Sequence, residues 1–172
     1  LNIDGILIYT GSLYGTNVGT DVGSDGTFQT NIGALAGSGS STNYSTNIGA
    51  FSGVSSSGDH QTTLGYQAGL NNDNIYQIAI GDGSGKGNLG RYQVAVGNQT
   101  GDDNTGDFQT ALGHRAGKLN TFDNVIQLSG GNTTAPASSS HNFCFSTNNF
   151  TTRIDTNISG NLDLKLPLTN GR

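Results

Sequence analysis

The chain has no Glu, Met or Trp, only 2 Pro and a single cysteine, Cys144, and Lys and Arg together make up 7 of its 172 residues. Strong helix formers are therefore scarce, whereas Asn, Ser, Thr and Gly (28 residues) are abundant. This mixture favours short strands separated by many turns. A lone cysteine also excludes an intrachain disulfide framework.

Positive charge is scarce as well, and the net charge is -5. Proteins that grip nucleic acid or an anionic membrane usually carry a basic patch, so we expect neither partner. No apolar run approaches the ~20 residues of a membrane span, so we expect no membrane insertion. No signal peptide is visible and the chain begins at Leu1 without Met, which predicts a fragment or a processed product.

Hydrophobic residues make up only 32% of the chain, so it is either disordered or buries few apolar residues efficiently. A regular period favours the second alternative. An aliphatic residue recurs at a constant interval, at Ile32, Ile48, Leu64, Ile80, Val96 and Leu112, with Leu128 next in step. A first glycine follows directly and a second comes four positions later: Gly33, Gly49, Gly65, Gly81, Gly97 and Gly113, then Gly37, Gly53, Gly69, Gly85, Gly101 and Gly117. The segment 14–23 fits the same phrase, at a slightly shorter interval before the next copy.

Within each unit, residues at positions 1, 3 and 5 alternate with those at positions 2 and 4. In one unit these are Tyr92, Val94 and Val96, which alternate with Gln93 and Ala95. The alternation predicts a short strand whose apolar face is buried. The first glycine is expected at a corner, where a Cβ would restrict the turn. A small residue always precedes the second glycine and predicts tight packing there: Ala36, Ser52, Ala68, Ser84, Thr100 and Ala116.

One strand and one loop per unit cannot bury their own apolar face, but stacked copies can. The sequence therefore predicts an all-β chain with a parallel β-solenoid of roughly seven or eight rungs, about 35–40 Å long. We expect a lead-in strand over 1–13, the repeats over 14–129, a linker over 130–141 and a C-terminal β segment over 142–172. That segment would be a neck or cap, with strands over 142–147, 150–155 and 161–168.

A column of glutamines also repeats, at Gln29, Gln61, Gln77, Gln93 and Gln109. These amides could hydrogen-bond to one another up the stack as a ladder. Alternatively, Gln is merely tolerated at a half-exposed place in the strand.

The phrases "FQTNIGALAG", "HQTTLGYQAG" and "FQTALGHRAG" resemble the head repeats of trimeric autotransporter adhesins, the YadA-like heads. The phrase "HQTTLGYQAG" is still more similar to the "TAIGYQA" repeats of phage and large-virus fibre proteins. The resemblance covers about residues 14–129. It implies a left-handed parallel β-roll, three chains side by side, and a place on an exposed stalk or fibre.

A physical argument also favours a homotrimer, because a narrow coil with few apolar side chains makes a meagre core and identical neighbours could cover its exposed strips. Along the stack, Asn31 and Asn47 give way to Thr63 and then to alanine, so we expect the three-chain interface to change character. A coiled-coil stalk would need heptads. None is visible, which favours the virus fibre over the bacterial adhesin.

Residues with chemical potential are sparse. We expect His60, His114 and His141 to be rung or surface residues and Cys144 to be a small buried residue between two phenylalanines. Asp102, Asp103 and Asp107 cluster in a polar loop. They are a weak candidate for Ca²⁺ or for paired glycosidase carboxylates. A threonine column (Thr30, Thr46, Thr62, Thr110) could suit an ice binder, but Ile78 and Val94 interrupt it and we expect it to face inward.

The sequence thus predicts a non-enzymatic, cofactor-free fibre or spike segment at a virion surface. Its expected partners are its own copies, other fibre or virion proteins, and a host surface glycan or protein, with no binding residues identified. The alternatives are a bacterial adhesin head at the cell surface, a glycan-cleaving spike module and an ice-binding solenoid.

Overall fold

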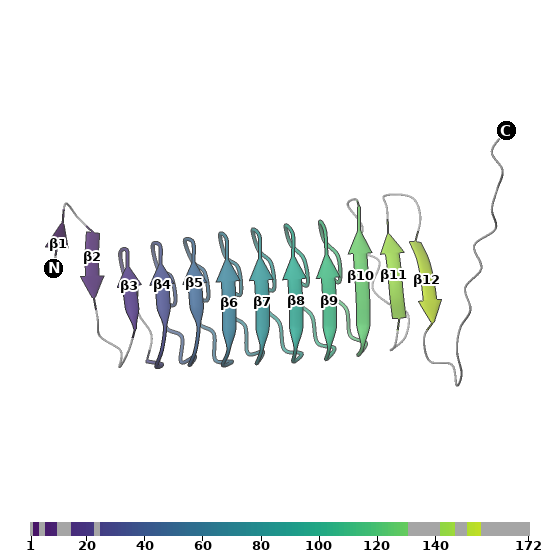
Figure 1. Ribbon diagram of the computed structural model, residues 1–172, viewed down its shortest axis with the longest axis horizontal. Helices are drawn as coiled ribbons and strands as arrows, with labels where there is room; N and C mark the ends of the chain where they lie inside the picture. Colours follow the sequence, from purple (N-terminus) through teal and green to yellow (C-terminus); the bar gives the residue numbers. More distant parts are fainter. Residues whose placement is uncertain are drawn as a thin grey trace.

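The computed structural model describes residues 2–3, 6–9, 15–22, 25–130, 142–146 and 151–155. Within these ranges all regular elements are strands, and no helix is long and apolar enough to cross a membrane. Twelve strands form one sheet in chain order (Figure 1). They are β1 (Asn2–Ile3), β2 (Ile6–Tyr9), β3 (Thr16–Val18), β4 (Thr30–Ile32), β5 (Thr46–Ile48), β6 (Gln61–Leu64), β7 (Gln77–Ile80), β8 (Gln93–Val96), β9 (Gln109–Leu112), β10 (Val125–Ser129), β11 (Asn142–Ser146) and β12 (Thr151–Asp155).

Strands β3 to β11 run parallel, and each pairs with the next along the chain (Figure 1). Ile48 pairs with both Ile32 and Leu64, so one turn of the coil corresponds to one repeat of the sequence. The first turn is slightly shorter, because Thr16 pairs with Thr30. Loops return the chain from the end of each strand to the start of the next (Figure 1). The predicted parallel β-solenoid is confirmed, with about seven turns.

Both ends of the stack reverse direction. At the N-terminal end, β2 pairs antiparallel with β1 and with β3. At the other end, β12 pairs antiparallel with β11. The strands expected over 142–147 and 150–155 are present as β11 and β12, whereas the strand expected over 161–168 and all but Gly130 of the linker predicted over 130–141 lie outside the described residues.

The first glycine of each unit forms the expected corner, with φ between 105° and 138° from Gly33 to Gly113. A Cβ on Gly65 would lie 2.6 Å from the carbonyl oxygen of Gly81 in the next rung. The second glycine meets the interior instead, since a Cβ on Gly101 would lie 3.1 Å from the Cβ of Ala95. Both positions therefore require glycine: a side chain would collide with the next rung at the first position and with the interior side chains at the second.

The strand faces are opposite to the prediction. Gln93 and Ala95, at positions 2 and 4, are 2% and 1% exposed, while Tyr92 at position 1 is 42% exposed. The same inversion holds along the stack, so the apolar face predicted to be buried points outward. The interior is too narrow for large apolar groups because the small residue before each second glycine, also fully buried, packs opposite the strand.

Amides fill this interior, but the glutamines do not form the proposed ladder with one another. Gln61, Gln93 and Gln109 donate Nε2–H to main-chain carbonyls 13 residues further on, at distances of 2.9 to 3.3 Å. Gln77 donates to the carbonyl of Gly85. The glutamines are buried, so the half-exposed alternative is also wrong.

A side-chain ladder exists one column away, at position 4. Asn31 donates to Asn17 at 2.8 Å, Asn47 donates to Asn31 at 2.8 Å, and the Thr63 hydroxyl donates to Asn47 at 2.7 Å. At Ala79, Ala95 and Ala111 this column holds methyl groups, and in β10 it holds Gln127. The change from Asn to Thr to Ala therefore alters the interior, not the outer face as expected from the sequence.

Candidate interaction surface

Positions 1, 3 and 5 of every rung point outward, and we call the surface that they form the outer face. It is largely apolar, with polar exceptions at His60 and at the threonines of position 3. Most of its large side chains are exposed: Phe28, Ile32, Tyr44, Leu64, Tyr76, Ile78, Tyr92, Phe108, Leu112 and Ile126. With ~4.8 Å per rung and ~3.3 Å per residue, it measures about 35 by 13 Å. This area is in the range of the largest apolar patches on soluble monomers, which often have a function.

Position 1 forms a ladder of stacked rings, in the order Phe28, Tyr44, His60, Tyr76, Tyr92 and Phe108. Successive ring centroids lie 4.8 to 5.0 Å apart and the ring planes are within 6° of parallel. Each of these residues has a φ of 54° to 60°, in the left-handed region. Identical backbone geometry in every rung thus aligns the rings, and their stacking offsets part of the cost of that conformation.

The threonine column at position 3 lies on the outer face, which corrects the inward placement expected from the sequence. Thr62 is exposed, and Thr30, Thr46 and Thr110 are half-buried. Ile78 and Val94 occupy the same outward column between them. The inward placement was one of two arguments against ice binding, and it no longer holds. The other argument, that Ile78 and Val94 interrupt the threonine column, remains.

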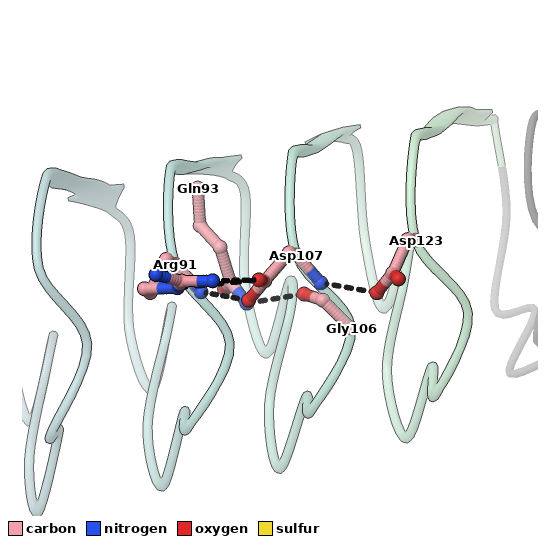
Figure 2. A network of polar contacts seen from close by, with 5 residues as sticks. All are labelled: Arg91, Gln93, Gly106, Asp107 and Asp123. Atoms are coloured by element: carbon pink, nitrogen blue, oxygen red, sulfur yellow. Dashed lines mark hydrogen bonds and ion pairs between the residues drawn. The ribbon is translucent and has the colours of Figure 1, made fainter.

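Directly before the ring position, in four of the units, an Asn or Asp side chain links its rung to the preceding one. The Asn43 N–H donates to Asp59 Oδ1 at 2.7 Å, and the Thr27 N–H donates to Asn43 Oδ1 at 3.0 Å. The pattern resumes where the Arg91 N–H donates to Asp107 and the Asp107 N–H donates to Asp123 (Figure 2). Asn or Asp directly before the ring position, interrupted by Ile75 and Arg91, was the signal in the sequence for these contacts, which were not predicted.

Arg91 and Asp107 also form an ion pair, with 2.9 Å between the Arg91 Nη2 and Asp107 Oδ2 atoms (Figure 2). The hydrogen bond from the Arg91 main-chain N–H, followed by those from its guanidinium, holds the pKa of Asp107 below its usual value. The Asp107 carboxylate likewise raises the pKa of Arg91. The pair is well exposed, so its contribution to stability is screened by solvent.

The structure does not assemble Asp102, Asp103 and Asp107 into a metal site. Asp102 pairs with Lys118 at 2.6 Å, and Asp107 is engaged by Arg91. Asp103 is exposed. Over the ranges that the structure describes, no group of three or more His, Cys, Asp or Glu side chains could hold a metal ion.

The remaining candidate residues have structural positions. His60 belongs to the ring ladder, between Tyr44 and Tyr76, and His114 is half-buried in a turn. His141 lies outside the described residues. Cys144 is buried, as predicted, while its neighbours Phe143 and Phe145 contact each other edge-on.

Comparison of the chain with models of protein families, with curated proteins and with solved structures finds no match. The resemblance to fibre and adhesin repeats therefore stays a prediction from the sequence.

Proposed function

We propose that this chain is a segment of a homotrimeric fibre or spike that projects from a virion and supports attachment to a host. The outer face carries the proposal. Exposed apolar surface of this extent is unfavourable in water, and the periodic columns present the same geometry at every rung. Three identical rods with these faces turned toward a common axis would cover them over their whole length.

The resemblance to the "TAIGYQA" repeats of virus fibres supports the same proposal and adds a left-handed coil. The C-terminal segment would act as the neck or cap of the fibre. The absence of heptads in the sequence favours the virion over the bacterial cell surface. The continuation of the chain separates the two, since an adhesin would lead to a membrane anchor and a virus fibre to further fibre or knob modules.

The mechanism is mechanical and multivalent. Main-chain pairing in every rung makes the rod stiff, and three chains present three copies of any weak surface site, which avidity multiplies. The partners would be other fibre or virion proteins and a host surface glycan or protein. The chain itself would perform no catalysis, so glycan turnover abolished by Asp102→Asn or Asp107→Asn would contradict the proposal.

Native mass measurement tests the trimer. We expect three times the chain mass for the wild-type protein and a single chain for the double variant Ile78→Lys, Val94→Lys, which places charges in the outer face. Thr105→Lys, in an exposed loop, is the matched control and should remain trimeric. A wild-type particle with the mass of one chain would reject the proposal.

A further inference from the structure

Among the tyrosines with described side chains, only Tyr76 and Tyr92 neighbour each other in the ring ladder. Their ring centroids lie 5.0 Å apart, their planes differ by 6°, and the side chains are 47% and 42% exposed. Tyr44 lies between Phe28 and His60, and Tyr66 contacts Phe51 edge-on. The two phenols are thus held side by side by the rung spacing itself.

We propose that Tyr76 and Tyr92 are a site of dityrosine formation, which links two rungs covalently when the protein meets a one-electron oxidant. Pairing of Gln77 with Gln93 fixes the two backbones in register directly beside the rings. Parallel, in-register rings bring equivalent ring carbons next to one another, so coupling needs only side-chain rotation at a partly exposed position. This property does not depend on the fibre function. A trimer that covers the outer face would also cover these rings, so we expect the link in single chains, and the protein is oxidised at high dilution.

The chemistry balances with a peroxide as the oxidant. Each phenol loses one electron and one proton, and the two phenoxyl radicals form a carbon–carbon bond between the ring positions next to the oxygens. The two hydrogens on those carbons then move to the oxygens and restore both phenols. Hydrogen peroxide, in taking up the two electrons and two protons, becomes two molecules of water. The product is lighter than the starting chain by two hydrogen atoms.

The test uses the native protein, illuminated with ruthenium tris(bipyridine) and peroxodisulfate, which accepts the two electrons as two sulfate ions. Trypsin cuts after Lys86 and Arg91, between the two tyrosines, so the link would join peptide 1–86 to peptide 92–115. We expect the blue dityrosine fluorescence, a joined peptide pair, and a band at the size of one chain on a denaturing gel.

Tyr76→Phe and Tyr92→Phe should each abolish the link while keeping the ladder intact, because Phe28 and Phe108 already occupy the same column. Tyr44→Phe and Tyr66→Phe are matched controls that should leave the link between the two peptides unchanged. In the Tyr92→Phe background, His60→Tyr should restore dityrosine, now with both partners in peptide 1–86. Fluorescence that survives Tyr76→Phe, or a link found only between separate chains, would overturn the proposal.

Discussion

Gly97 and Gly83 both have positive φ angles, of 136° and 61°, but only Gly83 has room for a side chain. A Cβ on Gly97 would lie 2.7 Å from the Gly113 carbonyl oxygen in the next rung. The nearest atom to a Cβ on Gly83 is 3.7 Å away, and Gln67 and Gln99 occupy the same place in neighbouring rungs with similar φ. Position in the unit therefore decides which glycines are indispensable.

Gly97→Ala is expected to lower the free energy of unfolding by roughly 2–3 kcal/mol, since both the strained backbone and the rung contact must adjust. Gly83→Gln, the matched control, should change it by less than about 1 kcal/mol. Denaturant unfolding followed by circular dichroism measures both values. An equal decrease in the free energy of unfolding for the two variants would show that the contact between Gly97 and the next rung does not account for the loss of stability.

The Asp107 carboxylate has a lowered pKa in the folded chain, so its contribution to stability is present above the pKa of the unfolded chain, about 4. That contribution should disappear as the pH falls through the lower folded value. Asp107→Asn should remove this pH dependence and retain the bond to the Arg91 N–H, as Asn43 does for Thr27. Unfolding curves at pH 7 and pH 3 would differ less for the variant than for the wild type; an unchanged difference would contradict this assignment.

At the scale of the strand, two adjacent threonines of β6 lie on opposite faces, so substitutions at the two positions test which face points into the solenoid. Thr62 is exposed on the outer face, whereas Thr63 is 0% exposed and bonds to Asn47. Thr62→Ile should be neutral or slightly stabilising, because Ile78 follows in the same column. Thr63→Ile should cost about 1–3 kcal/mol through overpacking and loss of a buried hydrogen bond.

Thermal unfolding of the two variants provides the measurement. Equal melting temperatures would contradict the assignment of faces. A larger loss in Thr62→Ile than in Thr63→Ile would show that the strand is oriented the other way.

The sequence predicted the strands and their register because both follow from a period that is visible in the residues. It could not assign the faces by hydrophobicity, since alternation gives two faces without saying which is inside. Variation in side-chain size was the better signal. From Phe28 to Phe108, position 1 varies among Phe, Tyr and His, whereas position 2 is Gln in five of the same six rungs, with Ser45 as the exception. Such a repeated residue indicates a close-packed interior.

The interaction surface was also only partly predictable. The need to cover apolar strips followed from the composition. The expected positions of two columns were wrong, since the Asn-to-Ala change lies in the interior and the threonines lie on the outer face. The hydrogen bonds of Asn43, Asp59, Asp107 and Asp123 depend on contacts between rungs, so a single unit viewed alone does not reveal them.

At the scale of the whole molecule, each rung contacts mainly its neighbours, so whole units should be removable. Deletion of residues 77–92 joins Tyr76 to Gln93 and retains every column. We expect a folded rod shorter by about 4.8 Å, measured by small-angle X-ray scattering. Deletion of residues 77–91 is the control: it leaves one extra residue, inverts the following strand faces and should lower the melting temperature sharply. Equal stability of the two deletions would refute the rung model of the chain.

A purely parallel stack of in-register strands would leave unpaired main-chain groups at each end, and such an edge is a template for adding further chains. Here the strand direction reverses at both ends, where β1 and β2 precede the stack and β12 follows it (Figure 1). At the C-terminal side an incoming copy of a parallel rung would therefore meet the antiparallel β12. At the N-terminal side it would meet β1, which runs in the direction of the stack but is only two residues long, after the antiparallel β2. Strand reversal and a very short outer strand thus disfavour end-to-end stacking of solenoids.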